Sequence, residues 1–113
     1  MASKIRNVGE VTILDVFERL TRVKEGERLG LDLGRILAAG NKRILINLHH
    51  VAFIDSAGLG ELLALKKTAL LAGAEVKLLR PREHVYSLIA EAGLQKVFEC
   101  YDDEETAVRS FET

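Results

Sequence analysis

Asp55 and Ser56 are the residues of this 113-residue chain whose types and placement most clearly suggest chemistry. They follow an apolar segment typical of a strand and precede a segment typical of a helix. A hydroxyl in the first turn of a helix lies close to unpaired backbone N–H groups and to the positive end of the helix dipole. A phosphate on Ser56 would be stabilised there. Serine and aspartate are also favoured N-cap residues, so an ordinary cap remains the alternative.

Other catalytic motifs are incomplete in this region. A nucleophile elbow needs Gly-x-Ser-x-Gly, but Ile54 stands at the first glycine position. A phosphate-binding loop needs a lysine after its glycines, whereas Gly60 is followed by Glu61. Leu63 occupies the place of the third glycine of a dinucleotide fingerprint. We therefore expect no catalytic residue and no cofactor in this chain.

A phosphorylated aspartate, as in receiver domains, is a further alternative because Asp55 also follows a strand. Such domains resemble a fold with an acidic pair after the first strand, and here only Glu18 is available. His49 and His50 are adjacent and would point in different directions on an extended chain, so we expect a loop and no metal site. Cys100 is the only cysteine, which excludes an internal disulfide, and we expect it to be a small buried residue on a strand.

Composition sets the class of protein. The formal net charge is −1, so no strong attraction to nucleic acid or to an anionic membrane is expected. No apolar run approaches the roughly 18 residues of a bilayer span, and the N-terminus lacks an apolar signal region. The sequence therefore predicts a single cytoplasmic domain over residues 1–113.

Strand-like and helix-like segments alternate along the chain. Apolar and β-branched runs predict strands at 11–17, 44–48, 76–79 and 97–100, with a shorter strand ending at Val8. Helical spacing predicts helices from about 27 to 39, from 61 to 72, from Pro81 to Gly93, and after 102. This alternation indicates an α/β fold, with 44–48 as a central strand covered on both faces. Ligands and partners of such folds meet the carboxyl ends of the strands, which is where Ser56 lies.

Local signals give expectations about the ends of these elements. Pro81 suits the first turn of the third helix. Asp102 and Glu105 suit a capping-box start for the last helix, with Val108 and Phe111 facing inward.

Two patterns concern packing. Val51, Phe53 and Ile54 are expected to return apolar side chains to the core. Glycines recur every fourth residue in the first helix, which indicates either close approach of another backbone or a soft helix; they are Gly26, Gly30 and Gly34.

With these elements in place, the chain resembles a STAS domain, the domain of anti-sigma factor antagonists. The matching residues are Asn47-Leu48, Val51-x-Phe53-Ile54-Asp55-Ser56-Ala57-Gly58-Leu59-Gly60, Ala72-Gly73-Ala74 before 76–79, Leu94-x-x-Val97-Phe98, and the segment 102–111. The resemblance implies a four- to five-stranded mixed sheet with helices mainly on one face.

The resemblance also implies a function. In this family the serine matching Ser56 is phosphorylated by an anti-sigma factor serine kinase, which the unphosphorylated antagonist sequesters, and a PP2C-type phosphatase resets the switch. The implied partner-binding residues are Asp55, Ser56, Ala57, Gly58, Leu59, Gly60 and Thr21, although Thr21 stands where aspartate is common and Glu18 where glycine is common. The implied protein is not an enzyme, and a weak homodimer is left open. The alternative is a non-catalytic STAS subunit of an ABC lipid-transport or stress-signalling assembly.

Overall fold

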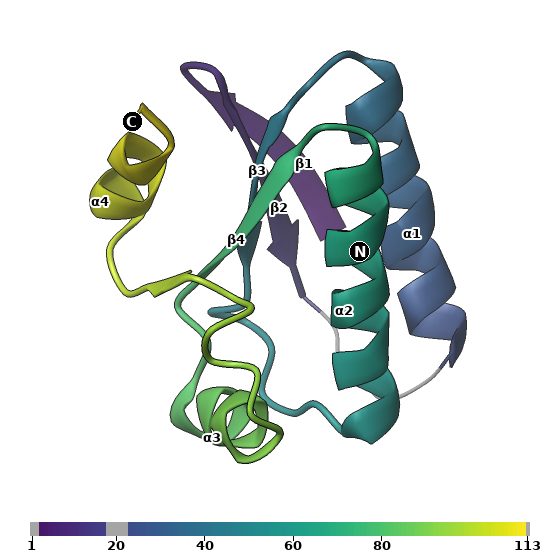
Figure 1. The fold of residues 1–113 in the computed structure, drawn as a ribbon, viewed down its shortest axis with the longest axis vertical. Coiled ribbons are helices and arrows are strands. Elements are labelled where there is room, and N and C mark those ends of the chain that lie inside the picture. The colour runs from purple at the N-terminus through teal and green to yellow at the C-terminus, as the bar shows by residue number, and fades with distance from the viewer. Residues whose placement is uncertain (1–2, 18–22, 113) are drawn as a thin grey trace.

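The computed structural model describes residues 3–17 and 23–112, so Glu18 and the predicted partner residue Thr21 lie outside the described residues. Strands and helices alternate along the chain, as expected (Figure 1). The strands are β1 Ser3–Val8, β2 Val11–Val16, β3 Arg43–Asn47, β4 Glu75–Leu79 and β5 Cys100–Tyr101. The helices are α1 Val23–Ala38, α2 Ser56–Leu71, α3 Glu83–Glu91 and α4 Glu104–Arg109, followed by a 3-10 turn at Ser110–Glu112.

The five strands form one mixed sheet in the order β1-β2-β3-β4-β5. β1 pairs with β2 in antiparallel fashion through the turn at Gly9, and the other neighbours are parallel. The parallel register places Asp15 beside Asn47 at the carboxyl ends of β2 and β3. The predicted four- to five-stranded mixed sheet is confirmed.

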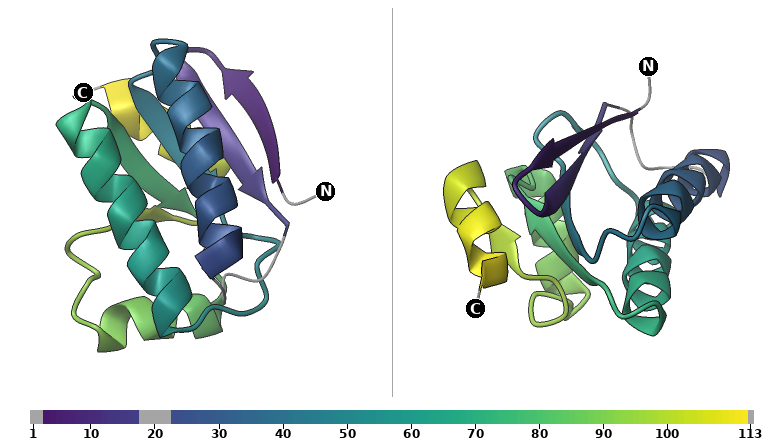
Figure 2. Two further views of the ribbon diagram at one scale, coloured as in Figure 1. Left: turned by 90° about the vertical axis from the view of Figure 1, so that its right-hand side faces the viewer. Right: turned by 90° about the horizontal axis from the view of Figure 1, so that it is seen from above.

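The sheet separates two layers of helices of unequal size. Successive side chains of a strand point to opposite faces, so Ile44 and Ile46 join the core under α1, α2 and α3, whereas Leu45 joins a smaller cluster under α4. Figure 2 shows α1 and α2 together on one side of the sheet and α4 on the other. Helices mainly on one face, and a central strand covered on both faces, are confirmed.

Three helices, α1, α2 and α3, begin at residues other than those expected. α2 begins at Ser56, five residues before the helical run expected from 61. α1 begins at Val23, about four residues before the expected start. α3 begins at Glu83 after the N-cap Arg82, so Pro81 precedes the cap and is not in the first turn. None of the helices within residues 3–17 and 23–112 combines the length and apolar character that crossing a bilayer requires.

The last helix is capped one residue later than expected. The Asp103 carboxylate accepts the backbone N–H of Thr106 at 2.9 Å and caps α4, so the prediction for Asp102 is wrong. The Arg80 side chain donates to the backbone carbonyl of Asp102 at 2.8 Å, and Asp102 lies in the loop between β5 and α4. Glu105 pairs with Arg109 one turn later and does not complete a capping box.

The last strand is also displaced from its predicted place. The backbone N–H groups of Val97 and Phe98 both bond to the carbonyl of Leu94, which closes a turn. Pairing with β4 therefore starts only at Glu99, whose carbonyl accepts from the Leu78 N–H, and β5 is Cys100–Tyr101. The strand expected at 97–100 is wrong for its first residues because their amides are already used locally.

Two of the three recurring glycines of α1, Gly30 and Gly34, do not serve close packing among the described residues, and the side-chain surroundings of Gly26 lie outside what the structure describes. Gly30 and Gly34 are exposed, and a Cβ added at either position would meet no heavy atom within 4 Å. Close approach of another backbone is therefore not the reason for glycine at these two positions. At the other end of the chain, Phe111 is buried and Val108 packs partly against it, as expected.

Candidate functional site

The site is built around the first turn of α2, at the carboxyl ends of the parallel strands. Asp55 is the N-cap: its backbone is extended, and its Oδ1 accepts the N–H of Gly58 at 2.9 Å. Its carbonyl accepts the N–H of Leu59, also at 2.9 Å. Asp55 thus performs the capping that the sequence left open between two residues, and Ser56 becomes the first helical residue.

Ser56 is exposed, and no hydrogen bond from its hydroxyl to any of the residues 3–17 and 23–112 is present. The hydroxyl projects from the first turn of a 16-residue helix, where the macrodipole is positive. A phosphoryl group attached there would gain favourable electrostatics without disturbing the cap on Gly58. The arrangement suits an accessible acceptor of a phosphoryl group.

The predicted partner-binding run is divided between the surface and the core. Ser56, Ala57 and Gly60 are exposed, and Asp55 is half-buried. Gly58 and Leu59 are buried, and Leu59 belongs to the main core. The three exposed residues are the ones that a partner can contact directly, while the buried pair anchors the turn.

Exposed aromatic side chains border this turn, and the sequence did not predict them as part of the site. Phe53 is 40% exposed, so its predicted place in the core is wrong. Residues 51–54 are not helical, and Val51 and Ile54 take the buried positions of this segment. The Phe53 ring instead stacks on His84 of α3, with centroids 5.1 Å apart.

A second ring pair extends this border. Phe17, which is 42% exposed, lies against His50, with ring centroids 4.9 Å apart. His49 meets His50 edge to face at 5.0 Å, in the loop predicted for the two histidines. All three histidines of the chain therefore lie in the loop before α2 or at the start of α3. In the sequence, His49 and His50 stand just before Phe53 and Asp55, and that spacing was a signal that could have marked this surface.

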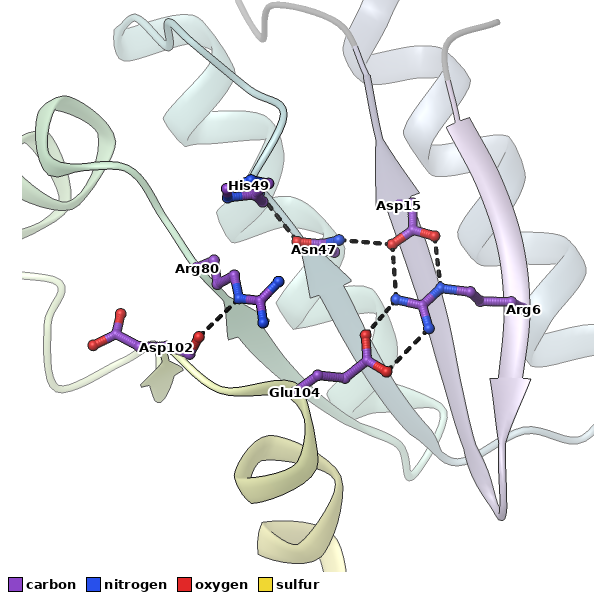
Figure 3. A network of polar contacts seen from close by, with 7 residues as sticks. All are labelled: Arg6, Asp15, Asn47, His49, Arg80, Asp102 and Glu104. Atoms are coloured by element: carbon purple, nitrogen blue, oxygen red, sulfur yellow. Dashed lines mark hydrogen bonds and ion pairs between the residues drawn. The ribbon is translucent and has the colours of Figure 1, made fainter.

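A polar network supports the loop that leads to Ser56 (Figure 3). The Asn47 side chain donates to Asp15 Oδ1 at 2.8 Å, and its own Oδ1 accepts the His49 backbone N–H at 3.1 Å. The Arg82 side chain donates to the His49 carbonyl at 2.8 Å. Both backbone groups of His49 are thus held, one from β3 and one from the start of α3.

The network continues across the sheet to the last helix. The Arg6 guanidinium contacts Asp15 at 2.7 and 3.2 Å and Glu104 at 2.5 and 3.1 Å, and lies between the two carboxylates (Figure 3). Asp15 and Asn47 were not predicted as functional residues. Both interrupt apolar strands, and Asn47 also belongs to the run that carries the family resemblance, but neither signal assigned them a role at the site.

The charged groups of this network shift one another's pKa values. Burial alone would raise the pKa of Asp15, but the hydrogen bonds from Arg6 and Asn47 outweigh it, and the pKa lies below its ordinary value. The hydrogen bond from Arg6 likewise lowers the pKa of Glu104. The bonds to Glu104 and then to Asp15 raise the pKa of Arg6. All three groups are therefore charged at neutral pH.

Two further observations concern metal ligands and the cysteine. Within residues 3–17 and 23–112, no group of three or more His, Cys, Asp or Glu side chains is arranged to hold a metal ion. Cys100 lies on a strand, β5, as expected, but it is half-buried where full burial was expected, and this burial raises the pKa of its thiol to about 11. A thiol with that pKa is a poor nucleophile near neutral pH.

Known proteins share this architecture. The chain is similar to an anti-sigma factor antagonist from Mycobacterium paratuberculosis, with 20% identity, a TM-score of 0.83, and coverage of 98% of this chain and 93% of that one. It is similar to the phosphorylated form of the Bacillus protein SpoIIAA, with 20% identity, a TM-score of 0.73, and coverage of 97% and 99%. It is also similar to a sulfate transporter family protein from Wolinella succinogenes, with 16% identity, a TM-score of 0.79, and coverage of 96% and 93%.

Identities of this size establish a shared fold. The sequence gives the more specific result, because a family model described as the STAS domain matches residues 7–107. The match includes the start of α2 with Ser56, and every strand except the first residues of β1. Because the matched region covers most of its length, this chain belongs to the STAS domain family.

Proposed function

We propose that this chain is an anti-sigma factor antagonist that binds an anti-sigma factor serine kinase while Ser56 is unphosphorylated. The kinase would phosphorylate Ser56, which ends the complex, and a PP2C-type phosphatase would restore the binding form. The observation that supports this most directly is the exposed Ser56 hydroxyl in the first turn of α2, next to a cap formed by Asp55 alone. The fold does not need the hydroxyl, so it is available for modification.

A phosphate at this position would destabilise the complex without destabilising the fold. It adds about −1.5 to −2 charge at neutral pH. In the free protein that charge is solvated and lies at the positive end of α2. In a complex it would be removed from water beside the half-buried Asp55 carboxylate, which repels it. The fold is therefore preserved while the interface is destabilised.

The surroundings of Ser56 also suit a protein partner. Phe17 and Phe53 are exposed aromatic side chains near a turn with exposed small residues. Aromatic anchors surrounded by small and polar residues are typical of interfaces whose energy is concentrated in a few contacts. The similarity to SpoIIAA, which has been studied in unphosphorylated and phosphorylated forms, supports the same interpretation.

The test is a binding titration of the chain against the catalytic domain of the anti-sigma kinase of the same organism. Ser56→Ala should bind at least as tightly as wild type in the presence of ATP, because it cannot be phosphorylated. Ser56→Glu should bind more weakly by about tenfold or more, since a charge is placed in a desolvated contact. Ser87→Glu, an exposed serine on α3, is the matched control and should leave the affinity unchanged.

The modified atom is identified separately. After incubation with kinase and ATP, mass spectrometry should find a hydroxylamine-stable phosphate on Ser56. A hydroxylamine-labile phosphate on Asp55 would instead support the receiver-type alternative. Equal kinase affinity for wild type, Ser56→Ala and Ser56→Glu would contradict the proposal and leave the role of a transporter or stress-assembly subunit.

A further inference from the structure

The outward side of α2 toward its C-terminus is unusually apolar. Buried leucines such as Leu62 and Leu65 face the core, as expected of a helix that covers a sheet. Leu70 and Leu71, however, are 71% and 81% exposed on the same helix. A helix with leucines on several sides is normally covered on more than one side. This part of α2 therefore presents apolar surface without a partner among the described residues.

A hollow lies beside this surface, between α2 and the turn that follows α3. Its volume is about 310 Å³, and it is lined by Leu63, Lys66, Lys67, Leu70 and Val97. The four residues from α2 have the spacing i, i+3, i+4 and i+7, so they form one stripe along the helix. Val97 closes the hollow from the turn at 94–97 and is 37% exposed. We name these five residues the α2 groove.

The charges around the α2 groove are mainly positive. Lys66 and Lys67 belong to the groove itself, and Lys96 lines an adjoining hollow of about 170 Å³ that shares Leu70 and Val97. Two carboxylates, those of Glu75 and Glu99, line the adjoining hollow. The Glu99 carboxylate is paired with Lys77 at 3.1 Å, and this contact lowers its pKa.

Two of these lysines are free to meet a ligand. Lys66 bonds to the Val76 carbonyl at 3.3 Å and lies over the ring of Phe98. Neither Lys67 nor Lys96 forms an ion pair with any residue in 3–17 or 23–112. The groove thus combines an apolar floor with cationic groups at its edge.

We propose that the α2 groove binds an acidic amphipathic helix of a partner protein. Leucine-like side chains of that helix would fill the hollow beside Leu70, and flanking carboxylates would face Lys67 and Lys96. The stripe on α2 has the spacing by which one helix packs along another. Opposite charges across the rim would favour this partner and discourage basic ones.

Two other occupants fit the groove less well. A second copy of the chain, related by a two-fold axis, would bring the lysines of the groove close to their own equivalents, which is unfavourable. For a bilayer surface, each lysine would contribute only about 1 kcal/mol of attraction to anionic lipid. Both remain distinguishable outcomes of the experiment.

The groove is distant from Ser56 along the helix. Ten residues separate Ser56 from Lys66, the nearest lysine of the α2 groove, or about 15 Å at a rise of about 1.5 Å per residue. This exceeds the Debye length of about 8 to 10 Å at physiological salt. A phosphate on Ser56 therefore leaves binding in the groove unchanged, and the chain can hold a second partner in either state of its serine.

The experiment uses the full chain and three synthetic helical peptides of equal length. The first has leucines at alternating three- and four-residue spacing with flanking glutamates, the second has lysines in place of the glutamates, and the third has the composition of the first in an order that abolishes the apolar face. Binding is followed by chemical shifts of the ¹⁵N-labelled chain and by calorimetry. We expect only the first peptide to bind, with a Kd between about 10 µM and about 1 mM and shifts at Leu63, Lys67, Leu70 and Val97.

Substitutions link that binding to the groove. Leu70→Ser should weaken it about tenfold, whereas the matched control Leu31→Ser, which changes a leucine on α1 that is 67% exposed, should not. The double variant Lys67→Glu with Lys96→Glu should reverse the preference and bind the lysine-flanked peptide. Ser56→Glu should bind the acidic peptide as wild type does, so failure here and failure of the proposed kinase binding are separate results.

Four outcomes would overturn the proposal. The first is the absence of chemical-shift changes in the α2 groove at about 1 mM acidic peptide, and the second is equal binding of all three peptides. The third is co-flotation of the chain with phosphatidylglycerol vesicles that Leu70→Ser abolishes. The fourth is a concentration-dependent dimer that Leu70→Ser abolishes. The third result would assign the groove to anionic lipid and the fourth to a second copy of the chain.

Discussion

Arg6→Met should destabilise the protein by removing the link between β2 and α4. The Asp15 side chain is 9% exposed and would lose two contacts from the guanidinium, keeping the one from Asn47. Removing one partner of a fully buried ion pair costs about 3 to 5 kcal/mol. The Arg6 side chain is 32% exposed, so water can partly replace it. We therefore expect a loss of about 2 kcal/mol at pH 7.

The loss should depend on pH in a defined direction. The folded-state pKa values of Asp15 and Glu104 lie below their ordinary values of 3.8 and 4.5. Each group therefore contributes stability that is present above its unfolded pKa and is lost as the pH falls through its folded pKa. In Arg6→Met the burial of Asp15 persists without the guanidinium, so its pKa should rise. The difference in free energy of unfolding between wild type and Arg6→Met should therefore become smaller below a pH of about 5.

The assay is urea unfolding followed by circular dichroism at pH 7 and at a pH of about 4. At neutral pH a loss of about 2 kcal/mol corresponds to a Tm lower by about 8 °C for a domain of this size. Arg109→Met is the matched control, because Arg109 pairs with Glu105 on the surface of α4, with side chains 69% and 71% exposed. It should change the stability by less than about 0.5 kcal/mol. Equal effects of the two arginine substitutions at neutral pH would refute the reasoning.

Other predictions follow from single contacts. Asp55→Ala removes the cap of α2 and should lower the free energy of unfolding by about 1 kcal/mol in urea titrations, and an unchanged stability would contradict the capping role. Gly34→Ala, at an open helical site, should raise the free energy of unfolding by about 0.5 kcal/mol, whereas Gly73→Ala, at a φ of +76°, should lower it, and equal effects would contradict the backbone argument. Cys100, with its pKa raised to about 11, should react with iodoacetamide at pH 8 much more slowly than glutathione, and a comparable rate would show that the thiol is not shielded.

The order and kind of the elements could be predicted from the sequence because hydrophobic periodicity is a local property. The apolar run at 44–48 is buried on both faces as β3, and the helical spacing after Ser56 forms α2. The resemblance predicted a mixed sheet of four to five strands for the same reason, since each stretch of residues that carries it is short and contiguous. These expectations needed no knowledge of contacts between distant segments.

Element ends were predicted less well, because backbone groups from distant residues compete for them. The turn closed on the Leu94 carbonyl shortened β5, and the bond from Arg80 to the Asp102 carbonyl accompanies the shift of the α4 cap to Asp103. The exposure of Phe53 likewise depends on which side chains of its segment face the core. Each correction involves hydrogen bonding or packing that composition does not encode.

What the sequence by itself determined is the presence of a serine and an aspartate at the start of a helix, together with the family to which that run belongs. What only the tertiary structure decided is which of the two does the capping: Asp55 bonds to Gly58, and Ser56 is left exposed. The structure alone also joined Arg6, Asp15 and Glu104, which are up to 98 residues apart. The physical reason is that side-chain exposure and ion pairing depend on the packing of strands and helices, and that packing brings together groups whose separation along the chain gives no sign of it.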